Sequence, residues 1–293
     1  MFDKIRGKSP SGHSKHDSSD IHQGSPLSIP GPPSYAASSS TPVPPFQTRF
    51  ASLSLHMEDR IRFLRFPEPV ISACRSAILS NWPQGISSER PYANSHEIKL
   101  DGYPWRGFGK DAAQARRLVK GVLSTLHANG WILTLTTDVS KTAADKDTLL
   151  FRYQAPPPAR HEWCSIAFSR QSRLRFIDCP PELYASLPQR IGSEWLKGQS
   201  EYAPGIWEFE LHGYPWSPTG KTTMQVRELL MALVEMLEEE GWSVYASIDQ
   251  KSSGGQGTSS YASKLMFLNM NDRHDEKKIG SSTPAQYYSL QIL

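Results

Sequence analysis

Cysteine is scarce in this 293-residue chain, which contains only Cys74, Cys164 and Cys179. An odd number of cysteines without metal-ligand spacing argues against a disulfide framework and against a structural zinc site. No run approaches the roughly 18 apolar residues that a membrane-spanning helix needs, and residues 1–15 lack the apolar core of a signal peptide. These absences predict a soluble, cytoplasmic protein without a transmembrane segment.

Basic clusters and catalytic motifs are missing as well. The formal net charge is only +3, and no block of Lys and Arg has the density that nucleic-acid binding requires. The chain contains no HExxH motif, no His/Cys cluster and no nucleophile elbow. We therefore expect no nucleic-acid partner, no metal, no cofactor and no catalytic residues.

The N-terminal segment is rich in Ser, Pro, Gly and His and poor in apolar residues. It cannot bury enough surface to offset the entropy of ordering, so residues 1–47 are predicted to be a disordered tail, and residues 271–293 a flexible one. The N-terminal tail contains Pro32-Pro33-Ser34-Tyr35, a PPxY element. Such peptides bind WW domains, because proline preorganises the extended chain and the tyrosine fills a pocket. A WW-domain ubiquitin ligase is the partner that this element suggests.

The rest of the chain is an internal duplication. Arg-Ile-Arg-Phe at 60–63 recurs as Arg-Leu-Arg-Phe at 173–176, and Gly-Tyr-Pro-Trp at 102–105 recurs at 213–216 after a two-residue deletion. Six of the eight tryptophans form pairs between the copies: Trp82 with Trp195, Trp105 with Trp216, and Trp131 with Trp242. These tryptophans are structural markers of the repeat, and we interpret them as core anchors. The repeats are assigned to residues 48–156 and 160–270.

Each repeat reads as an α+β unit with the order ββαβαββ. In the first repeat, we expect strands at 50–55, 60–64, 96–100, 131–137 and 149–153, and helices at 68–81 and from Ala115 to Leu126. Gly130 and its equivalent Gly241 are predicted to end the second helix of each repeat. Because the linker of residues 154–162 is short, we expect the repeats to pack as one pseudo-symmetric unit with an approximate twofold.

The Gly-Tyr-Pro-Trp turn, the Gly-Trp pair that ends the second helix, and the Lys146-Asp147-Thr148-Leu149 segment carry a resemblance. Over about residues 48–270, the chain resembles a group of fungal proteins built from this repeat. That group has no assigned activity, so the resemblance implies a fold and a duplication but no functional residues.

The strands of the two repeats share four arginines: Arg60, Arg62, Arg173 and Arg175. Two arginines on one face of a strand could bind a phosphate, a carboxylate or a lipid headgroup. Alternatively, they pair across strands with Glu97 or Glu208, and this is the interpretation that we favour. Gly220-Lys221-Thr222 lacks the upstream glycine of a phosphate-binding loop, so we interpret it as a turn into a helix.

The second helices differ in charge between the repeats. Residues 110–130 carry a net charge of +3, whereas residues 221–241 carry −3. Solvation explains this difference, and a basic partner for the acidic helix is the more specific alternative. The leading function is therefore a non-enzymatic interaction or adaptor protein with a PPxY tail. The alternatives are an anion or lipid-headgroup binder that uses the strand arginines, and an enzyme with its site in one copy only.

Overall fold

The structure, a computed structural model, describes residues 48–106, 111–137, 145–249 and 264–270. They all belong to one compact unit, Gln47–Leu293. The predicted tails, including the PPxY element, lie outside the described residues. None of the helices in these ranges is long and apolar enough to cross a membrane.

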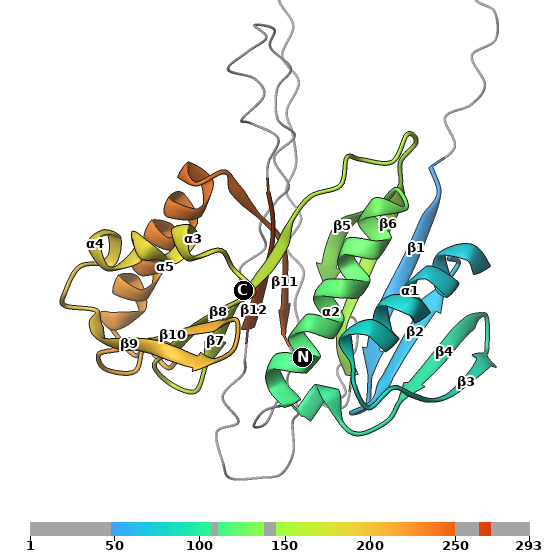
Figure 1. The fold of residues 1–293 in the computed structure, drawn as a ribbon, viewed down its shortest axis with the longest axis horizontal. Coiled ribbons are helices and arrows are strands. Elements are labelled where there is room, and N and C mark those ends of the chain that lie inside the picture. Colours follow the sequence, from blue (N-terminus) through green and yellow to red (C-terminus); the bar gives the residue numbers. More distant parts are fainter. Residues whose placement is uncertain (1–47, 107–110, 138–144, 250–263, 271–293) are drawn as a thin grey trace, which may run out of the picture. The chain divides into compact units, whose positions relative to one another are not determined.

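Repeat 1 is a six-stranded antiparallel sheet (sheet A) with two helices on one face (Figure 1). Its strand order is β3-β4-β2-β1-β6-β5. The elements are β1 (Phe50–His56), β2 (Arg60–Leu64), α1 (Glu68–Asn81), β3 (Ile86–Tyr92), β4 (Ser95–Leu100), the 3-10 turn η1 (Pro104–Arg106), α2 (Asp111–Ala128), β5 (Trp131–Thr137) and β6 (Asp145–Tyr153).

Repeat 2 forms a second six-stranded antiparallel sheet (sheet B) with the equivalent strand order, β9-β10-β8-β7-β12-β11. Its elements are β7 (Trp163–Ser169), β8 (Arg173–Ile177), α3 (Pro181–Ala185), α4 (Leu187–Ile191), β9 (Leu196–Ala203), β10 (Ile206–Leu211), α5 (Thr222–Glu239), β11 (Trp242–Asp249) and β12 (Lys264–Met270). The predicted α+β class and the duplication are confirmed.

Each repeat has one strand more than predicted, so the unit is ββαββαββ. The additional strands are the edge strands β3 and β9, whose side chains are mostly polar and exposed. An edge strand with little buried surface lacks the apolar alternation that identifies a strand in a sequence. The first helix of repeat 2 is also two short helices, α3 and α4, with Pro188 in the first turn of α4. Proline removes an interior helical hydrogen bond but is tolerated in a first turn.

Local sequence explains the remaining elements. In β2, Ile61 and Phe63 are buried and alternate with partly exposed arginines, as predicted. Gly130 and Gly241 follow α2 and α5 with φ of 81°, the left-handed conformation that ends a helix and that glycine adopts most readily. A Cβ atom at residue 130 would also lie 2.5 Å from the carbonyl oxygen of Gln154, so no side chain fits there.

The Gly-Tyr-Pro-Trp turn ties the loop of the first hairpin to the segment before the long helix. In repeat 1, the indole Nε1 of Trp105 donates to the carbonyl oxygen of Arg60 at 3.2 Å. In repeat 2, Nε1 of Trp216 donates to the carbonyl oxygen of Arg173 at 2.9 Å. Trp105 is fully buried, so its ring adds apolar burial to this hydrogen bond. The tryptophan that the duplication retains is therefore a core anchor.

The repeats contact each other through different surfaces. The core of repeat 1 includes five residues of repeat 2: Ala167, Ile177, Ile206, Ala246 and Ile248. These side chains lie on the face of sheet B opposite its own helices, and α2 packs there with the side that does not face sheet A. The equivalent side of α5 is exposed at Met224 and Met231. The contact is therefore head-to-tail and differs from the approximate twofold that we expected.

Charged side chains complete this head-to-tail contact. Arg117 Nη2 donates to Asp178 Oδ1 at 2.8 Å, and Lys120 Nζ donates to Asp178 Oδ2 at 2.5 Å. Burial alone would raise the pKa of Asp178, but the hydrogen bonds from Arg117 and Lys120 outweigh it and hold that pKa below its usual value. Arg117 also donates to the carbonyl oxygen of Pro204 at 3.1 Å. The basic charge of α2 is therefore used within the chain.

The same contact predicts a dependence of stability on pH. His127, near the end of α2, is buried against the rings of His161, Trp163 and Tyr245. Burial, assisted by the charge of His161, lowers the pKa of His127 to about 4. Since the unfolded chain binds this proton more tightly, the free energy of unfolding should fall as the pH drops from about 6.5 to 4, by up to about 1.4 kcal/mol per pH unit.

Urea unfolding of the wild type and of His127→Phe across this pH range measures the effect. Phe keeps an aromatic ring without a titrating group, so the curve of the variant should be flatter. Parallel curves for the two proteins would contradict the assignment.

Candidate interaction surface

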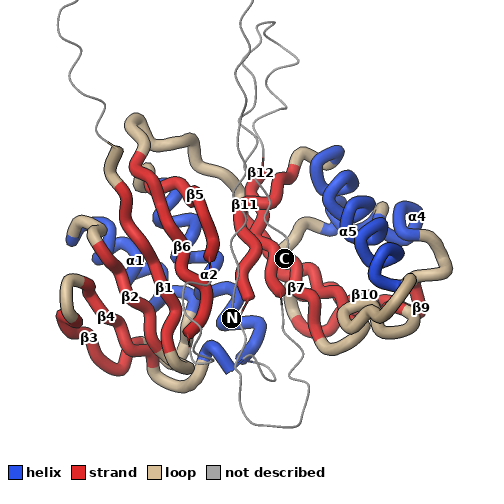
Figure 2. Tube along the Cα trace, turned by 180° about the vertical axis from the view of Figure 1, so that it is seen from behind, coloured by secondary structure: helices blue, strands red, loops and turns tan. Residues whose placement is uncertain are grey.

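The face of sheet A opposite α1 and α2 carries a row of side chains that crosses all six strands. We call it the outer row. It consists of Leu135, Leu150, Ser52, Leu64, Ser95 and Tyr92, each paired in register with the next across neighbouring strands. Residues paired in this way point to the same face of a sheet. Figure 2 shows this face, with the strands of sheet A in front of its helices.

Three large side chains of the outer row are exposed: Leu64 at 36%, Leu135 at 40% and Tyr92 at 42%. Single exposed apolar side chains are ordinary on a protein surface, but these three share one row. An apolar face of a sheet normally packs against another layer.

The equivalent row of repeat 2 shows what such a face can hold. It runs through Ala246, Phe267, Ser165, Ile177, Ile206 and Ala203 with the same register. Four of these residues, Ala246, Ser165, Ile177 and Ile206, are buried, and Ala246, Ile177 and Ile206 belong to the core that contains α2. The same position in the fold thus carries a helix in repeat 2.

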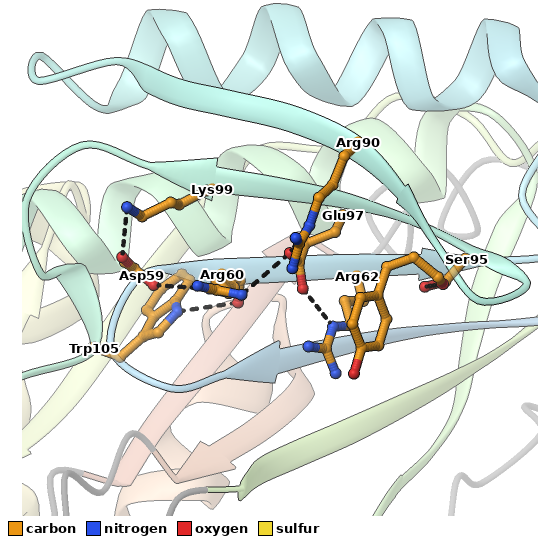
Figure 3. Close-up of polar contacts among 9 residues, drawn as sticks. Asp59, Arg60, Arg62, Arg90, Ser95, Glu97, Lys99 and Trp105 are labelled. Carbon is orange, nitrogen blue, oxygen red and sulfur yellow. Dashed lines mark hydrogen bonds and ion pairs between the residues drawn. The ribbon is translucent and has the colours of Figure 1, made fainter.

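A charged cluster lies beside the outer row, on β2, β3 and β4 (Figure 3). Glu97 is 2% exposed and accepts hydrogen bonds from Arg62 Nε at 2.7 Å and from Arg90 Nε at 2.8 Å. Arg60 Nη1 contributes a longer contact of 3.3 Å. Burial alone would raise the pKa of Glu97, but its arginine partners outweigh this and lower it.

The arginines that we considered for anion binding all contact carboxylates on neighbouring strands. Arg60 and Arg62 share Glu97. In repeat 2, Arg175 Nε donates to Glu208 at 2.6 Å, and Arg173 Nη1 lies 2.6 Å from Glu210. Tyrosine rings stack on two of them, Tyr92 on Arg62 and Tyr202 on Arg175. The cross-strand pairing that we favoured from the sequence is what the structure shows.

The loop at Gly220 also has the geometry of a turn. The hydroxyl of Thr222 donates to the carbonyl oxygen of Thr219 at 2.7 Å and accepts from the Thr219 amide at 2.9 Å. Thr222 is thus engaged with its own chain at the start of α5, in line with the turn that we predicted.

Arg116 was missed as a site residue at the sequence level. It lies on α2, is 2% exposed, and donates from Nη2 to the hydroxyl of Ser169 at 3.2 Å. Its Nε and Nη1 atoms have no hydrogen-bond partner among the described residues. Burial, and then the nearby charge of Arg175, lower the pKa of Arg116 to about 10. Its equivalent on α5, Arg227, is exposed, so the sequence of the two helices gave no signal of this burial.

The outer row was also missed, although a signal for it exists. Leu64 directly follows the inward-facing Phe63, so the alternation places it on the outer face, where a polar residue is expected. Its equivalent Ile177 is apolar at the same position. An apolar residue on the outer face in both repeats indicates a contact surface.

Comparison with known proteins agrees with the duplication. One protein-family domain matches the chain twice, over residues 49–152 and 162–268, and the two matches cover most of the chain. The chain belongs to this family. Each repeat is thus one copy of the same family domain, which confirms the tandem arrangement.

No curated protein matches the chain. Among solved structures, the chain is similar to a conserved kinetoplastid-specific protein from Trypanosoma cruzi, with 21% sequence identity and a TM-score of 0.28. The aligned region covers 37% of this chain and 93% of that protein.

The buried arginine yields a prediction about stability. A buried charge without a carboxylate partner carries an uncompensated desolvation cost. Arg116→Met keeps most of the side-chain volume and removes the charge, so it should raise the free energy of unfolding by on the order of 1 kcal/mol.

Urea unfolding at neutral pH measures this change. Arg227→Met, the same substitution at the equivalent exposed position, is the control and should shift stability by less than about 0.5 kcal/mol. A marked loss of stability in Arg116→Met would show that the guanidinium is satisfied in solution.

Proposed function

We propose that the protein is a non-enzymatic interaction or adaptor protein of the cytoplasm. In this proposal, the outer face of sheet A holds a protein partner, and the PPxY element of residues 32–35 recruits a WW-domain protein such as a ubiquitin ligase. We also propose that the tandem repeat groups with the fungal proteins that its motifs resemble.

The observation that carries the proposal is the difference between the two equivalent rows. In repeat 2, Ile177 and Ala246 are buried against a helix, whereas in repeat 1 their equivalents Leu64 and Leu135 are exposed. An apolar core surrounded by polar side chains is the usual composition of a protein-binding surface. Arg62 and Arg90 beside the row supply this polar border, and arginine is a frequent residue of binding surfaces.

The charges of this face favour a protein over a simple anion. Arg60, Arg62 and Arg90 all contact Glu97, and this carboxylate already takes the place that a phosphate or lipid headgroup would occupy. An anion would have to compete with a buried charge at distances below 3 Å. The paired arginines therefore support the anion-binding alternative less well than they support a polar border.

Site-specific crosslinking tests the proposed surface. A photoreactive phenylalanine analogue placed at Leu135 in the full chain should crosslink to a protein when expressed in the cells of origin, because this side chain lies in the outer row. Leu79, an exposed leucine on α1, provides the control position.

The two positions should differ. Selective crosslinking of a protein at Leu135 supports the proposal. It would be contradicted by crosslinks to lipid or nucleic acid, by equal crosslinking at both positions, or by no crosslink at Leu135.

The tail is tested separately. WW domains should bind the full chain and lose at least about tenfold in affinity for Tyr35→Ala, because the tyrosine fills the pocket that defines the motif. Ser34→Ala, at the variable position of the motif, is the control, and titration calorimetry gives the dissociation constants. Equal binding of wild type and Tyr35→Ala would remove the tail from the proposal.

A further inference from the structure

The head-to-tail contact uses only two of the four equivalent surfaces that the two repeats carry. Every repeat has two surfaces for such a contact, the outward side of its long helix and the outer face of its sheet. Within the chain, the outward side of α2 contacts the outer face of sheet B. The outward side of α5 and the outer face of sheet A have no counterpart among the described residues.

The free sheet face keeps the apolar character of the used one. Leu64 stands where Ile177 is buried, Leu135 stands where Ala246 is buried, and Leu150 stands at the register position of Phe267. Across the whole row, Leu135 and Tyr92 are larger than their equivalents, Leu64 matches Ile177 in size, and Leu150 and Ser95 are smaller than theirs. Three large apolar or aromatic side chains thus remain exposed on the free face for a helix to cover.

The free helix side is apolar in part as well. Met224 and Met231 of α5 are 60% and 56% exposed, and they stand at the positions of Ala113 and Lys120 of α2. Methionine is flexible and fills irregular gaps, so it suits a helix that packs onto a sheet.

One charge pair of the two unused surfaces is reversed relative to the pair in the used contact. In the used contact, Arg117 of the helix binds Asp178 at the end of β8. The equivalent of Arg117 is Glu228 on α5, and the equivalent of Asp178 is Arg65 at the end of β2. Both Glu228 and Arg65 are exposed. At this pair of positions, a positive helix residue and a negative sheet residue have become a negative helix residue and a positive sheet residue.

The backbone presents the two sheet residues in the same way. Arg65 has φ of 64° and Asp178 has φ of 53°, a left-handed conformation that is uncommon for residues other than glycine. Their side chains therefore leave equivalent strands at a similar angle. An α5 helix placed on sheet A as α2 is placed on sheet B would bring Glu228 to Arg65.

We propose that the protein associates with a second copy of itself, head to tail, with the outward side of α5 of one copy on the outer row of the next. This proposal rests on the proposed function, because it takes the same face of sheet A as the binding surface and names its occupant. The Glu228–Arg65 pair provides the specificity. It also keeps α5 from displacing α2 within the chain, where Glu228 would meet Asp178.

Such a contact joins unlike surfaces, so it continues from copy to copy until it closes into a ring. Sedimentation velocity of the full chain should therefore show association that increases with concentration. Arg65→Glu alone and Glu228→Arg alone should each weaken it by about tenfold or more, because the ion pair becomes a repulsion between like charges. The double variant Arg65→Glu/Glu228→Arg should recover the association.

Mixing the two single variants provides a sharper test. In the mixture, Glu228 of one variant can meet Arg65 of the other, and the two introduced charges also match. The mixture should therefore associate although each variant alone does so weakly. A symmetric contact between two α5 helices would not include Arg65, so Arg65→Glu alone would leave such a contact unchanged.

Arg170→Glu and Glu182→Arg are the controls. They reverse exposed charges elsewhere, and Arg170 shares the left-handed backbone of Arg65 with φ of 52°. These controls should associate like the wild type. The inference would be overturned by a wild-type chain that stays monomeric at about 100 µM, a concentration at which even a weak complex forms. It would also be overturned if neither Arg65→Glu nor Glu228→Arg changed the association.

The crosslinks at Leu135 separate the two proposals. A monomeric chain that crosslinks there to a different protein keeps the proposed function and refutes self-association. A chain that neither associates nor crosslinks refutes both.

Discussion

The burial of α2 on two sides is the constraint on which the rest of the structure depends. A helix that packs against a single layer needs one apolar stripe, and α2 has it in Leu118, Val122 and Leu126. The opposite side of α2 carries small or basic side chains, among them Ala112, Arg116 and Lys120. Small side chains let the outer face of sheet B approach, and the basic ones pair with Asp178 and Ser169. The core of repeat 1 therefore continues into repeat 2.

This arrangement gives equivalent residues different roles. Arg116 is buried while Arg227 is exposed, and Arg117 binds Asp178 while Glu228 lies on the surface. The charge difference between the two helices, which solvation alone could explain, has a structural counterpart: among the described residues, the basic helix α2 contacts a second sheet within the chain and the acidic helix α5 does not. The duplication thus gives two copies of one fold, and the molecule still exposes two unlike surfaces, the outer face of sheet A and the outward side of α5.

Much of this fold could be predicted from the sequence, and the misses have physical causes. The strands at β1, β2 and β4 and the two long helices follow from apolar periodicity and from glycines such as Gly130. The edge strands β3 and β9 bury too little to leave such a pattern. The alternation around Leu64 marks one outward apolar position, but the outer row as a whole was missed because its residues come from six strands and their register is not visible along a sequence. The burial of Arg116 depends on the neighbouring repeat, which no local pattern encodes.

The linker between the repeats raises the effective concentration at which they meet. Only residues 154–162 separate β6 from β7, and a tether of this length holds its two ends at an effective concentration in the millimolar range. A contact that operates at such a concentration needs little affinity of its own. This is why the α2 contact can tolerate alanines and an arginine with unpaired nitrogens, whereas any surface that must find its partner by diffusion needs larger apolar groups and better-matched charges.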